Sequence, residues 1–262
     1  MSQPRVLILR APGTNCDLET AHAFERAGGR AERLHVNRLL ESPKLVDDFQ
    51  ILCLPGGFSY GDDVAAGRIL GNQIRHHLAD CLARFKDAGK LILGICNGFQ
   101  ILIRSGVLLP LNADSSATAT LAWNAGGRFE DRWVPLTVSS EKSIFFAGIR
   151  TMYLPVAHAE GRFVPRDVQT LKALAANGQL VLRYGDNTTP IENAARVAFP
   201  ENPNGAIGDV AGVCDETGRV CGLMPHPERF IDPTQHPRWT REQLPAVGDG
   251  LRVFQNAVGY FR

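Results

Sequence analysis

The cysteine in LILGICNGFQIL (91–102) lies where an apolar run ends and a helix-like pattern begins. Gly94 lies two residues before Cys96, and Gly98 lies two residues after it. This G-x-C-x-G pattern is the thiol counterpart of the G-x-S-x-G nucleophile elbow, whose strained, sharply turning backbone needs small neighbours. Unpaired N–H groups at a helix N-terminus favour the reactive thiolate. The pattern predicts a nucleophile at Cys96; the alternative is a buried thiol beside two glycines that only shape a turn.

A thiolate that attacks a carbonyl needs a proton shuttle, and among seven histidines His226 in GLMPHPER (222–229) is the strongest candidate. It stands between two prolines, and the proline after it favours extended backbone. In extended chain, residues i and i+2 point to the same side, so we expect Glu228 to orient the imidazole. His158 and Glu160 have the same spacing without the prolines. We predict that this second pair lines the site.

The same chemistry needs N–H donors for an oxyanion. The N–H of Asn97 comes with the elbow. The glycine-rich turn PGGFSYGDD (55–63) follows another apolar run and offers Gly56 and Gly57, whose N–H groups can approach a ligand without a Cβ in the way. A plain turn is the alternative interpretation of this loop.

Apolar runs alternate with helix-like patterns over the first 110 residues, which indicates an α/β fold with a mainly parallel sheet covered on both faces. Ligand sites of such sheets lie at the carboxyl ends of the strands. The second half is strand-rich. We find no repeat or linker and predict one domain over residues 1–262 with a mixed sheet. The expected strands are 5–9, 31–36, 49–57, 90–95, 132–138, 152–158 and 179–185, with a hairpin at 211–224; the expected helices are 16–28, 64–89, 97–105 and 251–261, and the expected mobile loop is 111–120.

Composition excludes several classes of protein. The 262 residues carry a formal net charge of +1, which gives no hint of a nucleic-acid or membrane partner. No signal-peptide pattern is visible, and no run approaches the roughly 20 apolar residues of a membrane span, so we expect a cytoplasmic protein. None of the six cysteines forms a C-x-x-C pair, which argues against a zinc ribbon or a thioredoxin-like motif. A long chain that we expect in the cytoplasm also argues against a disulfide framework. We expect no metal.

Three of these segments together resemble the class I glutamine amidotransferases: GICNGFQIL as the nucleophile elbow, PGGFSYGDD as the oxyanion loop and PHPER as the His-x-Glu segment. A longer series in one order along the chain, with APGTNCD, WNAGGRFEDRWV, PVAHAEGRF and NPNGA, is similar to the glutaminase subunits or domains of phosphoribosylformylglycinamidine synthases. The resemblance implies a flavodoxin-like, three-layer αβα fold with a mixed, mainly parallel sheet.

Carried over residue by residue, the resemblance implies that Cys96 is the nucleophile, His226 the general acid/base and Glu228 its orienter. Gly57 and Asn97 become the oxyanion donors. The resemblance also places Gln100 in the glutamine pocket, to which we add Gly56 and Phe58 of the loop. It assigns His158 and Glu160 to a motif without a role. The tail 230–262 is unassigned; it could pack on the domain or face a partner.

The implied activity is hydrolysis of glutamine to glutamate through a Cys96 thioester. The ammonia would pass to a synthetase subunit that converts formylglycinamide ribonucleotide to formylglycinamidine ribonucleotide in purine biosynthesis. The resemblance places ATP and Mg on that partner. This chain has no G-x-x-x-x-G-K-[ST] loop, and no cofactor is expected here. Whether a third small subunit is required stays open. The alternatives are a stand-alone γ-glutamyl thiol hydrolase, a stress-related elbow-cysteine protein and a non-catalytic scaffold subunit.

Overall fold

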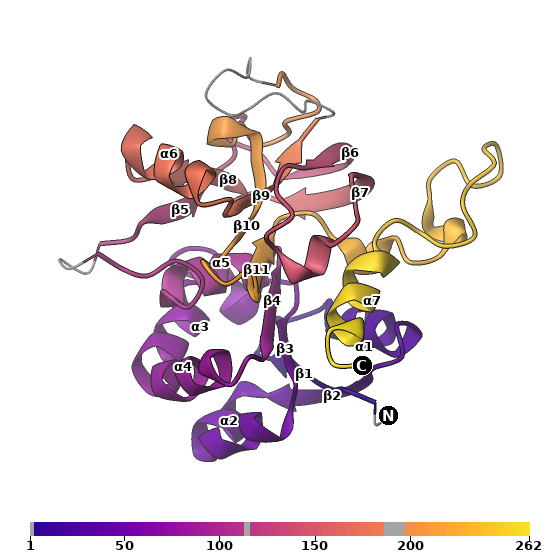
Figure 1. Cartoon of the computed structure of the whole chain (residues 1–262). Coiled ribbons are helices and arrows are strands. Elements are labelled where there is room, and N and C mark those ends of the chain that lie inside the picture. The colour runs from indigo at the N-terminus through magenta and orange to yellow at the C-terminus, as the bar shows by residue number, and fades with distance from the viewer. Residues whose placement is uncertain (1–2, 113–115, 186–196) are drawn as a thin grey trace.

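The computed structural model describes residues 3–112, 116–185 and 197–262 (Figure 1). The strands are β1 Arg5–Arg10, β2 Arg30–His35, β3 Ile51–Leu54, β4 Leu91–Ile95, β5 Ala119–Ala122, β6 Glu130–Val138, β7 Thr151–His158, β8 Arg162–Pro165, β9 Leu180–Tyr184, β10 Val210–Cys214 and β11 Val220–Leu223. The α-helices are α1 Asp17–Arg26, α2 Val36–Glu41, α3 Arg68–Gln73, α4 Ala79–Asp87, α5 Asn97–Ser105, α6 Val168–Ala176 and α7 Leu251–Gly259.

Within the described ranges, nine strands form one sheet in the order β2-β1-β3-β4-β11-β10-β9-β6-β7. The first five in this order are parallel, and the remaining pairs are antiparallel. The strands β3 and β4 in its middle are buried at every residue, which is the property of a parallel sheet covered on both faces. The predicted mixed, mainly parallel sheet is therefore confirmed.

Helices cover both faces of the parallel strands. Figure 1 shows α3, α4 and α5 on one side and α1 and α7 on the other. The helix α5 is buried on nearly all sides, since eight of its nine residues are buried. On the other side, the rings of Phe24 in α1 and Phe254 in α7 meet edge to face, with centroids 4.9 Å apart. The end of the chain is thus part of the core.

The C-terminal tail separates into two parts. Its last helix packs on α1, and His236 is buried against the aromatic rings of Trp133, Tyr153 and Phe230. Residues 237–243 between these anchors are exposed. Much of the 230–262 segment therefore packs on the domain, and its longest exposed run is 237–243.

Several local expectations need correction. The single helix expected over 64–89 begins only at Arg68, and a π-helical turn at Ile74–Leu78 joins α3 to α4. The expected loop 111–120 overlaps β5, which pairs with β8 in a separate two-stranded sheet, while its residues 113–115 lie outside the described ranges. The helices α2 and α6 were not expected. None of the described helices has the length and apolar composition needed to cross a bilayer.

Candidate active site

Cys96 occupies the one-residue junction between β4 and α5. Its backbone has φ 51° and ψ −105°, a conformation that is costly for a residue with a Cβ. A Cβ on Gly94 would lie 2.6 Å from the carbonyl oxygen of Gly98, and one on Gly98 would lie 1.9 Å from that of Leu54. Both positions therefore require glycine because helix, turn and strand approach so closely there. The strained backbone and small neighbours that define a nucleophile elbow are both present.

His226 lies just after the end of strand β11, next to Cys96. It follows β11, which runs parallel to β4 with Leu223 opposite Ile95, and the Cys96 N–H donates to the Leu223 carbonyl at 2.7 Å. Since the carboxyl ends of neighbouring parallel strands meet at one edge, two segments 130 positions apart in sequence arrive at the same place. The His226 N–H also donates to the Pro155 carbonyl at 2.8 Å, which fixes its backbone.

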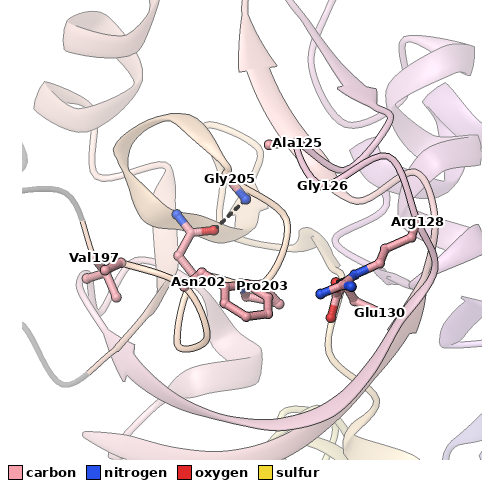
Figure 2. A pocket seen from close by; sticks show the side chains of 10 residues that line it. Ala125, Gly126, Arg128, Glu130, Val197, Asn202, Pro203 and Gly205 are labelled. Carbon is pink, nitrogen blue, oxygen red and sulfur yellow. Dashed lines mark hydrogen bonds and ion pairs between the residues drawn. The ribbon is translucent and has the colours of Figure 1, made fainter.

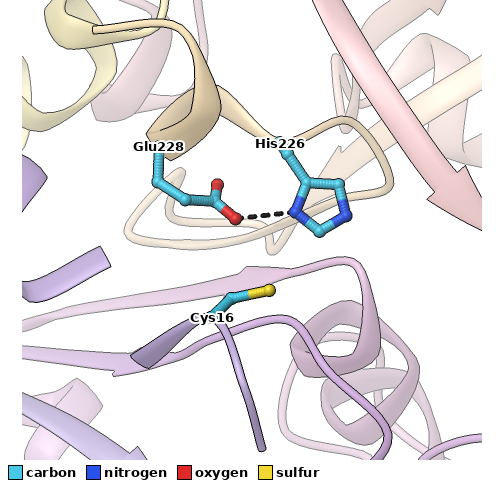
Figure 3. Close-up of side chains that lie close together, drawn as sticks. All are labelled: Cys16, His226 and Glu228. Carbon is cyan, nitrogen blue, oxygen red and sulfur yellow. Dashed lines mark hydrogen bonds and ion pairs between the residues drawn. The ribbon is translucent and has the colours of Figure 1, made fainter. Parts of the chain in front are cut away.

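Glu228 holds the imidazole of His226, as expected, but by a different backbone route (Figure 3). The Nδ1 of His226 lies 2.6 Å from Oε1 of Glu228, and the side chains are only 2% and 0% exposed. The segment is not extended: Pro227–Arg229 form a 3-10 turn. The fixed φ of proline suits the first position of such a turn, so Pro227 starts a turn where we expected extended backbone.

Burial and the neighbouring charges act in opposite directions on the pKa of His226. Burial by itself lowers the pKa of His226, but the Glu228 carboxylate and then Cys96 raise that pKa well above its usual range. The protonated imidazole is thus stabilised next to the sulfur, the state that a thiolate–imidazolium pair requires.

Two cavities open on Cys96. The first, which we call the Cys96 cavity, measures about 200 Å³ and includes Cys96, Gly57, Phe58, Gln100, His158 and Glu160 in its lining. The second, which we call the His226 cavity, measures about 210 Å³ and includes Cys96, Gly57, Phe58, His226, Cys16 and Arg229. Most of the predicted site residues therefore share walls with Cys96. Gly56 lines neither cavity: a Cβ there would lie 2.8 Å from Cε1 of His226, so this glycine makes room for the imidazole.

The loop after β3 is braced against the N-terminal turn. Gly57 has φ 137° and bridges to Thr14, and a Cβ on it would lie 2.7 Å from the Asn15 nitrogen. The Phe58 N–H is already used, because it donates to the Gly13 carbonyl at 3.0 Å. Phe58 is 44% exposed and stacks on Phe129 at the rim. The loop is thereby held rigidly next to the elbow.

The buried side chain of Asn97 joins the elbow to this loop. Its Oδ1 accepts the Ser59 N–H at 3.1 Å, and its Nδ2 donates to Asp62 and to Oε1 of Gln100. The Nε2 of Gln100 in turn donates to the Glu160 carbonyl. Both ends of the Gln100 amide are therefore engaged by the protein, so Gln100 shapes the cavity wall.

His158 and Glu160 are brought to the Cys96 cavity but do not pair with each other in the described structure. The Nδ1 of His158 lies 3.2 Å from Oδ1 of Asn124. Burial, followed by the positive charge of His226, lowers the pKa of His158 to about 3. The surroundings of His158 thus disfavour its imidazolium form, whereas those of His226 favour it.

Sequence reasoning missed three residues at the site: Asp62, Asn124 and Cys16. Asp62 lies inside the recognised PGGFSYGDD segment and Cys16 inside APGTNCD, so their place in those segments was the available signal. The ligand atoms of Cys16, His226 and Glu228 lie within 4.8 Å of one another (Figure 3). The Arg229 guanidinium lies 3.2 Å from the Cys16 sulfur, and Nδ1 of His226 is hydrogen-bonded to Glu228, so these side chains form a hydrogen-bonded network. All six cysteines lie in the described ranges as free thiols.

A larger cavity of about 560 Å³ lies elsewhere and contains none of the predicted site residues (Figure 2). The buried carboxylate of Glu130 in its wall is neutralised by Arg128, at 2.9 Å, and by Arg132. Asn202 in the opposite wall accepts the Gly205 N–H at 2.9 Å. The charged side chains of this cavity are thus paired with each other or with Arg132, and we assign it no role in the reaction.

The chain is similar to known proteins along its whole length. A family model described as a CobB/CobQ-like glutamine amidotransferase domain matches residues 3–261. A phosphoribosylformylglycinamidine synthase subunit PurQ of Dehalococcoides mccartyi is 46% identical, covering 100% of this chain and 99% of the relative. One from Methanococcus maripaludis is 41% identical, covering 98% of each.

Solved structures agree with these matches. A structure of PurLQS from Thermotoga maritima covers 100% of both chains with 34% identity and a TM-score of 0.74. The glutaminase domain of Trypanosoma brucei CTPS with bound acivicin, at 12% identity and a TM-score of 0.55, covers 98% of this chain and 94% of that one and supports the fold alone. The expected flavodoxin-like fold class and the family resemblance are confirmed. The chain belongs to the family of CobB/CobQ-like glutamine amidotransferase domains, among the subunits of the PurQ type.

Proposed function

We propose that this chain is the glutaminase subunit of a phosphoribosylformylglycinamidine synthase. The observation that carries the proposal is the strained elbow at Cys96 beside the buried His226–Glu228 pair, 2.6 Å apart, on the adjacent strand end. A nucleophile, a shuttle and an orienting carboxylate are the parts that covalent amide hydrolysis requires. Membership in a family of such subunits supports the same conclusion.

In the proposed reaction, His226 takes the proton of the Cys96 thiol, and the sulfur adds to the side-chain carbonyl carbon of glutamine. The oxyanion is stabilised by the N–H groups of Gly57 and Asn97. His226 then gives the proton to the departing nitrogen, so that ammonia leaves and a γ-glutamyl thioester remains. Water, deprotonated by His226, attacks the thioester carbon and releases glutamate and the Cys96 thiol. Glu228 keeps the imidazole oriented and stabilises its charged form throughout.

In this proposal, the ammonia passes to a partner subunit. We infer a complex with a synthetase subunit that uses ATP and Mg to convert formylglycinamide ribonucleotide to formylglycinamidine ribonucleotide, in the cytoplasm. The relatives bear the name of this enzyme, and the similar Thermotoga structure is of a complex, PurLQS, which also makes a third, small subunit part of the proposal. The chain acts as a single domain in this proposal, and the exposed residues 237–243 are its tail segment available to the partner.

The alternatives have specific weaknesses. A stand-alone γ-glutamyl thiol hydrolase needs no partner, whereas the relatives are named as subunits. A non-catalytic scaffold has no use for a strained cysteine backbone or for a buried carboxylate that charges an imidazole. Glutamine hydrolysis coupled to a synthetase is therefore the better supported function.

Labelling with a glutamine-analogue electrophile tests the nucleophile. We expect one label per chain, located at Cys96 by mass spectrometry, with both label and glutaminase activity lost in Cys96→Ala. Cys81→Ala is the matched control, since Cys81 is also a buried free thiol but lies on α4. Glutamine hydrolysis should be weak for the chain alone and stronger with the synthetase subunit. Labelling at another cysteine, or full activity of Cys96→Ala, would contradict the mechanism.

A further inference from the structure

The loop that carries Gly57 has a strained backbone. Within residues 58–64, three residues other than glycine, Tyr60, Asp62 and Val64, have left-handed φ angles of 55°, 54° and 71°. This region is disfavoured for residues with a Cβ, and most for a β-branched residue such as valine. Strained backbone persists only where the surrounding contacts hold it, so the contacts of this loop decide where the Gly57 N–H lies.

The side chain of Asn97 connects this loop to the elbow. Asn97 is 2% exposed, and its amide oxygen and both amide N–H groups are engaged. The oxygen accepts the Ser59 N–H at 3.1 Å. The nitrogen donates to Oδ1 of Asp62 at 3.0 Å and to Oε1 of Gln100 at 2.9 Å, which fixes the orientation of the amide. Two of these bonds reach into the loop and the third stays on α5, so the amide sets the position of the loop relative to α5.

Ser59 lies at the centre of this connection. Its side chain is buried, and the hydroxyl has no hydrogen-bond partner among the described residues, whereas its N–H donates to Asn97. Gly57, two residues earlier, bridges to Thr14, which fixes the loop against the N-terminal turn. The bond to Asn97 is a second anchor, on the side of the nucleophile. Displacement of Ser59 would therefore move the nearby Gly57 peptide.

The proposed reaction needs two N–H groups, those of Gly57 and Asn97, to converge on one oxyanion. Such donors must lie within hydrogen-bonding distance of the place that the oxyanion takes, and a displacement of about 1 Å costs about 100-fold in rate. We propose that the Asn97 side chain is a positioning residue, which holds the strained loop so that the Gly57 N–H meets the Asn97 N–H at the oxyanion. One residue thus supplies one donor through its backbone and aligns the other through its side chain. The inference rests on the proposed glutaminase function and adds to it a role for this side chain.

Asn97→Ala tests the inference on the chain with its synthetase subunit. The variant keeps both oxyanion N–H groups but removes the three side-chain bonds, so we expect kcat for glutamine to fall about 10- to 100-fold. KM should stay within about 3-fold, because the oxyanion is absent from the bound ground state. The rate of Cys96 alkylation by iodoacetamide should also stay within about 3-fold, since the sulfur displaces iodide without forming an oxyanion. A loss that falls on KM, or equally on alkylation, would overturn the inference.

A second substitution tests the role of strain. Val64 is 78% exposed, and glycine adopts a left-handed backbone without the steric cost that valine has. Val64→Gly added to Asn97→Ala should therefore raise kcat at least about 3-fold above that of Asn97→Ala, because less strain drives the loop out of position. No recovery would contradict the argument that strain makes this anchor necessary.

Asn202→Ala is the matched control. Asn202 is also buried, and its amide holds another loop by accepting the N–H groups of Gly205 and Ala206, away from the elbow. This variant should melt at a lower temperature but keep its kcat. If Asn97→Ala does not fold, as judged by thermal melting, Asn97→Asp takes its place, since it keeps the shape and the acceptor for Ser59 but lacks both donors. An unchanged kcat in Asn97→Asp overturns the inference. Failure of the wild-type complex to hydrolyse glutamine would instead contradict the proposed function.

Discussion

Replacement of Glu228 by glutamine tests the reasoning about the shuttle most directly. The substitution keeps the shape and a hydrogen-bond acceptor but removes the negative charge 2.6 Å from Nδ1 of His226. A hydrogen bond between charged, buried partners contributes about 1.5–3 kcal/mol, which corresponds to a rate loss of roughly 10- to 150-fold. We therefore expect kcat/KM for glutamine to fall by about this factor or more, with Cys96 still accessible to a small alkylating reagent.

The pH dependence of Glu228→Gln should change in a definite direction. Glu228 is the largest influence that raises the pKa of His226, while burial lowers it and remains in the variant. The ionisation of the imidazole in the pH–rate profile should therefore move to lower pH. The same linkage acts on stability: a raised folded pKa stabilises the protein fully below the unfolded value near 6.5, and this contribution is lost as the pH rises through the folded value. Glu228→Gln should remove this slope.

The assay is a glutaminase measurement from pH 5 to pH 10 with the synthetase subunit present, beside thermal melting over the same range. Glu32→Gln is the control, because this variant also loses one carboxylate, which pairs with Arg5 on β1 and lies far from the elbow. An unchanged rate and pH profile in Glu228→Gln would refute the assignment of Glu228 as the orienting charge. A profile shifted to higher pH would refute the electrostatic account even if activity falls.

Two further predictions concern packing and pH. Gly98→Ala should destabilise the protein by about 1–3 kcal/mol or prevent folding, because its Cβ would lie 1.9 Å from the Leu54 carbonyl oxygen. Gly259→Ala is the control and should not destabilise the protein, since the space around Gly259 is open. Chemical denaturation measures the free energy of unfolding of both variants. The pKa of Asp62 is about 6 in the folded protein, against an ordinary value near 3.9, so its carboxyl group binds a proton more tightly when the protein is folded. Protonation of Asp62 therefore stabilises the folded state fully below about pH 4, and this stabilisation is lost as the pH rises through 6. After allowance for partial exposure we expect about 1 kcal/mol, and melting curves of Asp62→Asn should lack this decline; an identical slope in wild type and variant would contradict the burial of this carboxylate.

Local patterns were sufficient where backbone sterics act within a few residues. The helix Asn97–Ser105 and the hairpin strands Val210–Cys214 and Val220–Leu223 were predicted correctly, since apolar runs and glycine turns carry their own signal. The strands β5 and β8 were not expected, because each has four residues and their pairing joins segments some 45 residues apart. The prediction of extended backbone around Pro227–Arg229 was wrong for a similar reason. Proline is compatible with both extended chain and a 3-10 turn, and contacts with distant residues decided between them.

The features of the site likewise fall into those that the sequence predicted and those that depend on tertiary contacts. The sequence alone indicated the elbow through its glycine spacing. Glycine at 94 is required by atoms of the same strand–turn–helix unit, whereas glycine at 98 is required by Leu54 on the neighbouring strand β3. The sequence also identified the two segments that meet, through their resemblance to a known family. Only the tertiary structure decided that β11 lies next to β4 and so brings His226 to the sulfur, and that Asp62 joins Glu160 in one cavity. Strand order, burial and the resulting pKa values depend on contacts between distant residues, and no short stretch of sequence contains them.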